Sequence, residues 1–158
     1  MINKIRRKEV ELIIYDFDGV MTNNKVLINE DGKESVFCDR SDGLAISNIK
    51  KMGLPQIIIS TEKNKIVEMR AKKLGIQVIH GMDCKKSIVK KYCDERNINL
   101  NKVVFIGNDI NDLEVMKIVG YPIAPSDAYA AIKNEAKFLT KAKGGEGVIR
   151  ELLIILET

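Results

Sequence analysis

The sequence predicts a three-layer α/β domain built on a parallel, Rossmann-like sheet. Short apolar runs rich in Ile and Val alternate along the chain with longer segments whose apolar residues recur at helical spacing. Strands that alternate with helices of this size form parallel βαβ units, with helices on both faces of the sheet. The chain has 158 residues, which is the size of one domain with a single core. We therefore expect residues 1–158 to form one domain.

The first predicted strand, Leu12–Tyr15, is the element around which the others are arranged. Its length and β-branched residues are typical of a strand buried on both faces, and Gly19 marks where it has ended. Asp16 and Asp18 follow it directly. Two carboxylates at the end of a buried strand repel each other and need a counter-charge. A divalent metal together with a phosphorylated ligand is the natural candidate.

A β-hairpin is predicted just beyond the two aspartates. The apolar runs 26–28 and 36–37 flank residues 29–32, which include an Asp-Gly pair. Asp-Gly between two such runs is a strong hairpin signal. The hairpin should project from the domain, and we expect no inserted cap domain.

The remaining elements continue the alternation of strands and helices. Further strands are predicted at 55–60, 77–79, 102–106, 121–124 and, as an extended segment, 137–139. Helices are predicted from a cap at Ser41 or Asp42 to about Gly53, over 66–75, over 83–97, from 109 through 119, over 127–134 and over 148–156, after a glycine-rich turn at 144–147.

Composition excludes several classes of protein. The 26 basic and 22 acidic residues give a formal charge of +4, but no basic stripe is interleaved with aromatic residues, so we expect no nucleic-acid partner. No apolar run approaches membrane-spanning length, so we expect no membrane partner. Three cysteines without metal-ligand spacing are typical of reduced thiols, which predicts a cytoplasmic protein.

Polar residues that end the predicted strands should converge on one site. In a parallel sheet the ligand site lies outside the carboxyl ends of the strands, near a switch in strand order. The residues expected there are Asp16, Asp18, Ser60, Thr61, Lys85, Asn108, Asp109, Asn111 and Asp112. They supply a nucleophile, a second carboxylate, hydroxyls, an ammonium group and further metal-binding oxygens.

These residues carry a family resemblance. DFDGVMT at 16–22, Ser60, Lys85 and GNDIND at 107–112 resemble the four ordered motifs of the haloacid dehalogenase superfamily of phosphotransferases. The hairpin, CDRSDG at 38–43, STEKN at 60–64 and GGEGVIRE at 144–151 resemble its small capless branch. That branch contains 3-deoxy-octulosonate 8-phosphate phosphatases, nonulosonate (sialic acid type) 9-phosphate phosphatases and the phosphatase-like domain attached to acylneuraminate cytidylyltransferases.

The resemblance implies a phosphatase mechanism that suits these residue types. Asp16 would attack phosphorus to give an aspartyl phosphate, because a carboxylate needs no deprotonation at neutral pH. Asp18 would protonate the departing sugar oxygen and then take a proton from water. Lys85 would neutralise charge, and the Ser60 hydroxyl would orient the phosphoryl oxygens.

The resemblance also implies Mg²⁺, held by Asp16, the backbone carbonyl of Asp18 and the fourth motif. Carboxylate and amide oxygens suit Mg²⁺, and no His or thiolate cluster is present to attract zinc. Many relatives have Asp where this chain has Asn108. An amide oxygen carries no charge, so we expect weaker metal binding unless Asp109 or Asp112 compensates.

For the substrate, the resemblance implies a keto-deoxy sugar acid phosphate. The octulosonate branch usually has Thr-Gly-Arg where this chain has Ser60-Thr61-Glu62. A glutamate at position 62, paired with Lys73, resembles the nonulosonate branch. We therefore expect a nine-carbon sugar phosphate in preference to the eight-carbon one.

The resemblance implies that capless members of the branch form homotetramers, in which a neighbour's hairpin and C-terminal segment cover each site. The hairpin segment from Val20 to Phe37, Arg40 and the 144–150 segment fit that role, and Arg150 could meet a phosphate or a carboxylate. The candidate substrate contacts are thus Thr22, Arg40, Thr61, Glu62, Lys73 and Arg150.

Each candidate also has a purely structural interpretation. Ser60 could cap the next helix, Lys85 could be a solvated lysine beside Lys86, and Glu62 with Lys73 could be an ordinary ion pair. The fourth-motif residues Asn108, Asp109 and Asp112 could serve merely to cap and charge the start of a helix. The competing function is a non-catalytic oligomerisation or regulatory module, while a phosphosugar mutase is disfavoured because no cap would shield its intermediate from water.

Overall fold

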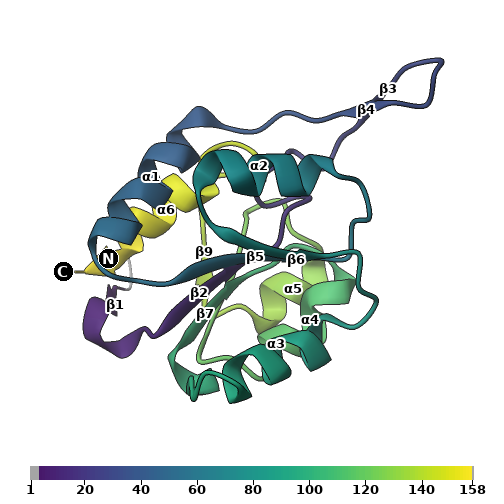
Figure 1. The fold of residues 1–158 in the computed structure, drawn as a ribbon. Helices are drawn as coiled ribbons and strands as arrows, with labels where there is room; N and C mark the ends of the chain where they lie inside the picture. The colour runs from purple at the N-terminus through teal and green to yellow at the C-terminus, as the bar shows by residue number, and fades with distance from the viewer. Residues whose placement is uncertain (1–3, 158) are drawn as a thin grey trace.

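The computed structural model describes residues 4–157, and a six-stranded sheet lies at its centre (Figure 1). The strand order is β6-β5-β2-β7-β8-β9, and every pairing is parallel. The strands are β2 (Leu12–Tyr15), β5 (Gln56–Ser60), β6 (Gln77–His80), β7 (Val103–Ile106), β8 (Tyr121–Ala124) and β9 (Phe138–Leu139). The predicted parallel α/β fold is confirmed.

Helices cover both faces of this sheet and make three layers (Figure 1). On one face lie α1 (Arg40–Lys51), α2 (Ile66–Leu74) and α6 (Val148–Ile155), and on the other lie α3 (Lys85–Asp94), α4 (Leu113–Met116) and α5 (Ala130–Glu135). Side chains of a strand point alternately to opposite faces. Ile13 and Tyr15 accordingly join the first apolar core, and Leu12 and Ile14 join the second.

The strand order creates a switch point beside β2. The chain passes from β2 outward through β5 and β6, then returns to place β7 on the other side of β2. The loops that follow β2 and β7 therefore lead in opposite directions, which leaves a crevice at their carboxyl ends. Asp16 follows β2 and Asn108 follows β7 at this crevice.

The start of α1 differs from the prediction. Its N-cap is Asp39, whose carboxylate accepts a hydrogen bond from the Ser41 backbone N–H at 2.7 Å, and not Ser41 or Asp42. Asp42 is instead buried on the inner side of the helix. The sequence analysis predicted a cap at Ser41 or Asp42, and the position of the cap depends on this long-range packing of Asp42.

Other boundaries also differ. The helix predicted over 83–97 is the shorter α3, and the helix predicted from Asp109 begins as a 3-10 turn, Ile110–Asp112, before α4. Further 3-10 turns lie at Arg7–Glu9 and Leu100–Lys102. Two-residue strands β1 (Ile5–Arg6) and β10 (Leu156–Glu157) pair in parallel and join the chain ends, which no pattern predicted.

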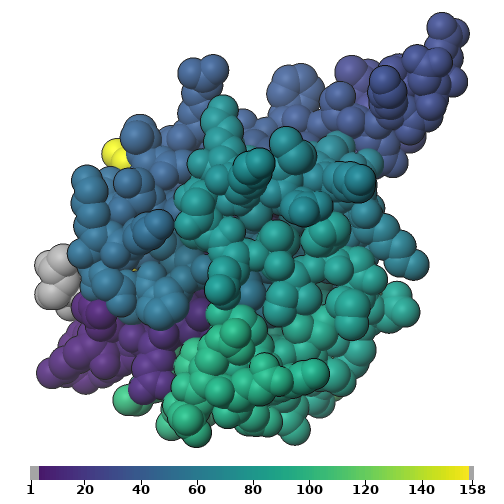
Figure 2. Space-filling model, in the orientation of Figure 1, coloured from purple at the N-terminus to yellow at the C-terminus, as the bar shows by residue number. Residues whose placement is uncertain are grey.

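The hairpin between β2 and α1 projects from the body of the molecule (Figures 1 and 2). Its strands are β3 (Leu27–Ile28) and β4 (Glu34–Ser35), so the second strand lies earlier than the predicted 36–37. Apart from this hairpin, residues 4–157 insert no further domain into the sheet. Within the same residues, none of the helices has the length and apolar character needed to span a membrane.

Candidate active site

The predicted strand-end side chains do converge. One cavity of about 100 Å³ is lined by Asp16, Asp18, Asn24, Ser60, Thr61, Asn108, Asp109 and Asn111. Larger hollows of about 650 and 550 Å³ lie along β6, but none of the predicted strand-end residues lines them. The small cavity is therefore the candidate active site, because it gathers the reactive groups.

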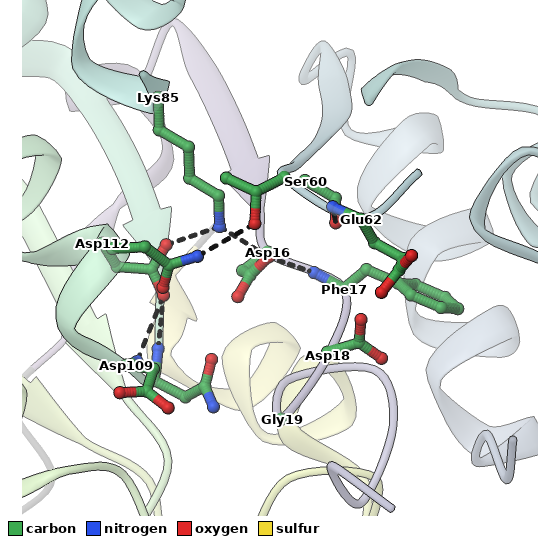
Figure 3. Close-up of polar contacts among 12 residues, drawn as sticks. Asp16, Phe17, Asp18, Gly19, Ser60, Glu62, Lys85, Asp109 and Asp112 are labelled. Atoms are coloured by element: carbon green, nitrogen blue, oxygen red, sulfur yellow. Dashed lines mark hydrogen bonds and ion pairs between the residues drawn. The ribbon is translucent and has the colours of Figure 1, made fainter. Parts of the chain in front are cut away.

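A buried ionic cluster forms the floor of this site (Figure 3). The Lys85 Nζ lies 2.7 Å from Asp16 Oδ1 and 2.6 Å from Asp112 Oδ1, and the side chains of Lys85 and Asp112 are at most 1% exposed. The Phe17 backbone N–H also donates to Asp16 Oδ1 at 2.7 Å. The interpretation of Lys85 as a solvated lysine is therefore wrong.

Local structure fixes Asp112 in this cluster. Its Oδ2 accepts the backbone N–H of Asn108 at 2.9 Å and that of Asp109 at 3.3 Å. A Cβ at Gly107 would lie 2.7 Å from the Asp112 Cβ, so only glycine lets the turn approach so closely. Both oxygens of Asp112 are thus engaged, and its geometry suits holding Lys85 better than ligating a metal.

Asp109 has a similar local role. Its carboxylate accepts the Ile110 backbone N–H at 2.7 Å and forms a capping box with Asp112. The structural interpretation of a helix-start cap thus describes Asp109, although it also lines the cavity. Ser60, by contrast, does not cap α2, because that helix begins at Ile66 after Lys65. The Ser60 hydroxyl instead accepts the Glu62 backbone N–H at 3.1 Å.

The charges of the cluster are unbalanced, with one ammonium against two carboxylates. Burial, together with the negative charge of Asp112, raises the pKa of Asp16 to about 8, although Lys85 opposes this shift. Burial lowers the pKa of Lys85, but the two carboxylates outweigh it and hold that pKa above its ordinary value. A further cation beside Asp16 would remove the excess negative charge.

Asn108 completes a set of oxygens that fits such a cation. One terminal atom of its amide lies 3.0 Å from Asp16 Oδ2 and 2.8 Å from the Asp18 carbonyl oxygen. With nitrogen there, Asn108 donates to both atoms; with oxygen there, three oxygens face one another. Neighbouring ligands of octahedral Mg²⁺ are separated by about 2.9 Å, so the spacing suits this ion.

This set contains a single carboxylate. Among residues 4–157, no group of three or more His, Cys, Asp and Glu side chains could hold a metal. The fit depends instead on one carboxylate, one backbone carbonyl and the neutral amide of Asn108. Affinity for a divalent cation should therefore be lower than at a site with two carboxylates.

Asp18 lies on the other side of the cavity, half-buried. Burial raises its pKa, and the negative charge of Glu62 raises it further, whereas the hydrogen bond from Thr22 lowers it. Figure 3 shows the carboxyl groups of Asp18 and Glu62 facing each other. A carboxyl group that keeps its proton to higher pH is suited to act as a general acid.

Thr22 is fully buried, and its hydroxyl serves the loop that carries the two aspartates. The hydroxyl donates to Asp18 Oδ1 at 3.3 Å and accepts the Gly19 backbone N–H at 3.2 Å. This is the position of a residue that holds the loop in shape. It does not fit the predicted direct contact with substrate.

Three other predicted substrate contacts lie away from the cavity. Arg40 and Lys73 line a separate groove of about 570 Å³ between α1 and α2. Arg150 is exposed in the first turn of α6. Thr61 does line the cavity, where its hydroxyl accepts a hydrogen bond from Asn111 Nδ2 at 3.1 Å.

The predicted pairing of Glu62 with Lys73 is wrong within one chain. No ion pair joins them among the described residues, and Glu62 Oε1 accepts the Asn64 backbone N–H at 2.9 Å instead. Glu62 precedes α2, whereas Lys73 lies in its last turn. At a rise of about 1.5 Å per residue, Lys73 is roughly 10 Å along the helix from Ile66.

The glycine-rich segment lies against the catalytic loop of its own chain. The Gly145 backbone N–H donates to the Val20 carbonyl at 3.0 Å, and a Cβ at Gly144 would lie 2.2 Å from the Gly19 carbonyl oxygen. The segment was predicted to cover a neighbour's site. Its observed contacts make it a support for the 19–23 loop.

No role at the site was predicted for Asp42 or Asn24. The Asp42 Oδ1 accepts the backbone N–H groups of Ile149 and Arg150, both at 3.0 Å, and so ties α1 to the start of α6. Its Oδ2 is buried without a partner, and burial raises its pKa to about 6. A contact between residues so far apart in the sequence leaves no pattern from which it could be predicted. Asn24 is a residue type that favours turns, and no other feature of the sequence indicated a role for it.

Comparisons with known proteins find similar chains. The chain is 30% identical over 154 residues to the 3-deoxy-D-manno-octulosonate 8-phosphate phosphatase of Yersinia pestis, covering 96% of this chain and 82% of that protein. It is 28% identical over 152 residues to the Escherichia coli K12 enzyme of the same name, with 96% and 81% covered.

Solved structures have the same fold. A protein from Streptomyces avermitilis described as a HAD family hydrolase superposes with a TM-score of 0.95 and 39% identity, covering 97% of this chain and 88% of that one. The octulosonate 8-phosphate phosphatase of Moraxella catarrhalis, solved with magnesium, phosphate and KDO, gives 0.89 and 28%, covering 93% and 85%.

The family itself follows from a direct match. A model of the haloacid dehalogenase-like hydrolase family matches residues 1–152. This confirms the expectation of an enzyme, because the family is one of hydrolases. Together with the 30% identity to an octulosonate phosphatase over nearly the whole chain, it shows that this protein belongs to the haloacid dehalogenase-like hydrolases.

Proposed function

We propose that this protein is a Mg²⁺-dependent phosphatase that hydrolyses a keto-deoxy sugar acid phosphate through an aspartyl phosphate on Asp16. One observation carries the proposal: the Asp16 carboxylate reaches two sites at once. Its Oδ1 meets Lys85, and its Oδ2 lies 3.0 Å from the Asn108 amide, which also lies 2.8 Å from the Asp18 carbonyl oxygen. A nucleophile held between an ammonium group and a cation site is suited to attack a phosphate dianion.

The first step forms a bond between an Asp16 carboxylate oxygen and phosphorus and breaks the bond from phosphorus to the sugar oxygen. Asp18 gives its proton to that leaving oxygen, which its raised pKa favours. In the second step Asp18 takes a proton from water, the water oxygen bonds to phosphorus, and the Asp16 carboxylate is released with inorganic phosphate.

The other groups position and neutralise the phosphoryl group. Lys85 offsets the charge of Asp16, and the buried Ser60 hydroxyl is free to donate because it accepts the Glu62 N–H. A Mg²⁺ ion held by Asp16, Asn108 and the Asp18 carbonyl would supply further positive charge to the phosphoryl oxygens.

Two sugar phosphates compete as the substrate. The relatives support 3-deoxy-octulosonate 8-phosphate, since the Yersinia and Escherichia proteins carry that activity in their names. Glu62 supports the nine-carbon nonulosonate 9-phosphate expected from its resemblance, because its carboxyl group lies beside Asp18 at the site. A carboxylate there could accept hydrogen bonds from a longer polyol chain.

Parallel assays test the proposal. Phosphate release from both sugar phosphates is measured with Mg²⁺ and with excess chelator, and Asp16→Asn serves as the inactive control. The substrate with the higher kcat/KM is assigned. Absence of release from either, with Mg²⁺ present, would contradict the proposal and favour the non-catalytic oligomerisation module.

We also propose that the chain forms a homotetramer in the cytoplasm. The hairpin supports the assembly, because Val26, Leu27, Ile28 and Phe37 are 50–74% exposed in a single chain. Apolar side chains gathered in this way mark an interaction surface. All three cysteines are free, which supports a reducing compartment.

A further inference from the structure

Two described residues other than glycine have a positive φ, and both are asparagines. Asn24 has φ of 62° and Asn97 has φ of 52°. This left-handed region disfavours side chains with a Cβ, and asparagine tolerates it better than most residues. Glycine would be the unstrained choice at both positions.

Backbone structure alone explains the positive φ of Asn97. Asn97 follows α3, and its neighbour Ile98 donates its backbone N–H to the Cys93 carbonyl at 2.9 Å. This is the ordinary left-handed ending of a helix, where asparagine is the usual alternative to glycine. Asn97 lines the hollow of about 650 Å³ along β6 and is not among the residues that line the catalytic cavity.

Asn24 ends no helix. It lies at the bend where the chain leaves the catalytic loop for the hairpin, and its backbone N–H donates to Thr22 Oγ1 at 3.1 Å. Asn24 is one of the residues that line the cavity with Asp16 and Asp18, and it is exposed to solvent. Among the described residues, none forms a hydrogen bond with the Asn24 carboxamide, so that group is free to bind a ligand.

The size of the cavity places the sugar at its rim. About 100 Å³ is well below the roughly 300–1,000 Å³ of pockets that enclose a small-molecule ligand. A phosphoryl group with its ester oxygen fills that space, so the carbon chain of the substrate must leave across the mouth. Thr61 and Asn111 also line the cavity and bind each other at 3.1 Å, whereas the Asn24 carboxamide has no such partner among the described residues.

We propose that Asn24 is a specificity-determining residue whose carboxamide binds a hydroxyl of the sugar chain next to the phosphate ester. The inference rests on the proposed sugar-phosphate phosphatase activity. A carboxamide both donates and accepts, so it recognises a neutral hydroxyl without adding charge beside Asp18 and Glu62. A phosphate monoester without hydroxyls gains nothing from this contact.

Replacement by glycine isolates the carboxamide, because glycine keeps the positive φ without strain. The experiment compares the wild type, Asn24→Gly and the matched control Asn97→Gly on octulosonate 8-phosphate and on p-nitrophenyl phosphate, both with Mg²⁺. Asn24→Gly should lower kcat/KM for the sugar phosphate, relative to that for the aryl phosphate, by roughly three- to tenfold. Asn97→Gly should leave this ratio at the wild-type value.

Three outcomes would overturn the inference: an unchanged ratio in Asn24→Gly, equal losses on both substrates, or the same change in Asn97→Gly. Thermal unfolding of the three proteins identifies any general loss of structure. Failure of the proposed function is separate, because the wild type itself would then release no phosphate from octulosonate 8-phosphate or from nonulosonate 9-phosphate, and the inference would fall with it.

Discussion

The ionic floor of the site and the projecting hairpin are organised in opposite ways. On the floor, Lys85, Asp16 and Asp112 are buried, and their charged atoms meet at 2.6–2.7 Å. The hairpin pairs only Leu27–Ile28 with Glu34–Ser35 and exposes its apolar side chains. A single chain thus completes the reactive centre, whereas the hairpin leaves apolar surface uncovered that the proposed homotetramer would bury.

The largest expected effect is on the floor. Asp16→Asn removes the nucleophile, so kcat for phosphate release should fall by at least about a thousandfold. Circular dichroism and thermal unfolding check that the fold is kept. Activity within tenfold of the wild type would show that the carboxylate of Asp16 is not the nucleophile.

Adjacent lysines offer a matched pair for the next test. Lys85→Ala leaves two buried carboxylates without their counter-charge and should lower the free energy of unfolding by about 3–5 kcal/mol. Lys86 makes an exposed ion pair with Glu114 at 3.2 Å, so Lys86→Ala should cost at most about 1 kcal/mol. Urea unfolding of both variants measures the difference, and equal losses would contradict a buried cluster on Lys85.

The hairpin should matter for assembly more than for folding. The double change Leu27→Ser and Ile28→Ser removes exposed apolar groups and should weaken self-association at least about a hundredfold. Met69→Ser is the control, since Met69 is 63% exposed on α2. Sedimentation velocity over a concentration series gives the masses; unchanged association in the double variant would exclude the hairpin from the interface.

Asp42 links α1 to the segment that supports the catalytic loop, and its raised pKa predicts a pH dependence of stability. With a pKa of about 6 in the folded state and about 3.9 in the unfolded chain, the folded state binds more protons between these values. The free energy of unfolding should therefore fall as pH rises from 4 to 6. Asp42→Asn should remove roughly 2 kcal/mol of that change, as measured by urea unfolding at pH 4, 5, 6 and 7. If the free energy of unfolding changed equally with pH in the wild type and in Asp42→Asn, the raised pKa of Asp42 would be contradicted.

The smallest expected effect concerns the metal. Asn108→Asp adds a charged ligand and should lower the Mg²⁺ concentration for half-maximal activity about tenfold. Asn111→Asp adds the same charge at the rim, away from Asp16 Oδ2, and should have less effect. An unchanged Mg²⁺ requirement in Asn108→Asp would show that Asn108 is not a ligand.

The sequence predicted the floor of the site better than its rim. Apolar runs located the strands, and parallel strands bring their polar carboxyl ends to one edge, so the meeting of Asp16, Lys85 and Asn108 could be expected. The tie from Asp42 to α6 and the burial of Thr22 could not, because polar contacts between distant segments follow no period. The predicted helix boundaries were also wrong where a cap or a 3-10 turn depended on such contacts.

Trapping the intermediate tests the central claim most directly. Substrate carrying radiolabelled phosphate is mixed with excess enzyme and Mg²⁺, the reaction is quenched with acid, and the labelled peptide is identified. The account predicts label on the peptide that contains Asp16, absent from Asp16→Asn and from chelator-treated enzyme. Rapid phosphate release with no labelled protein, or with label on another peptide, would contradict it.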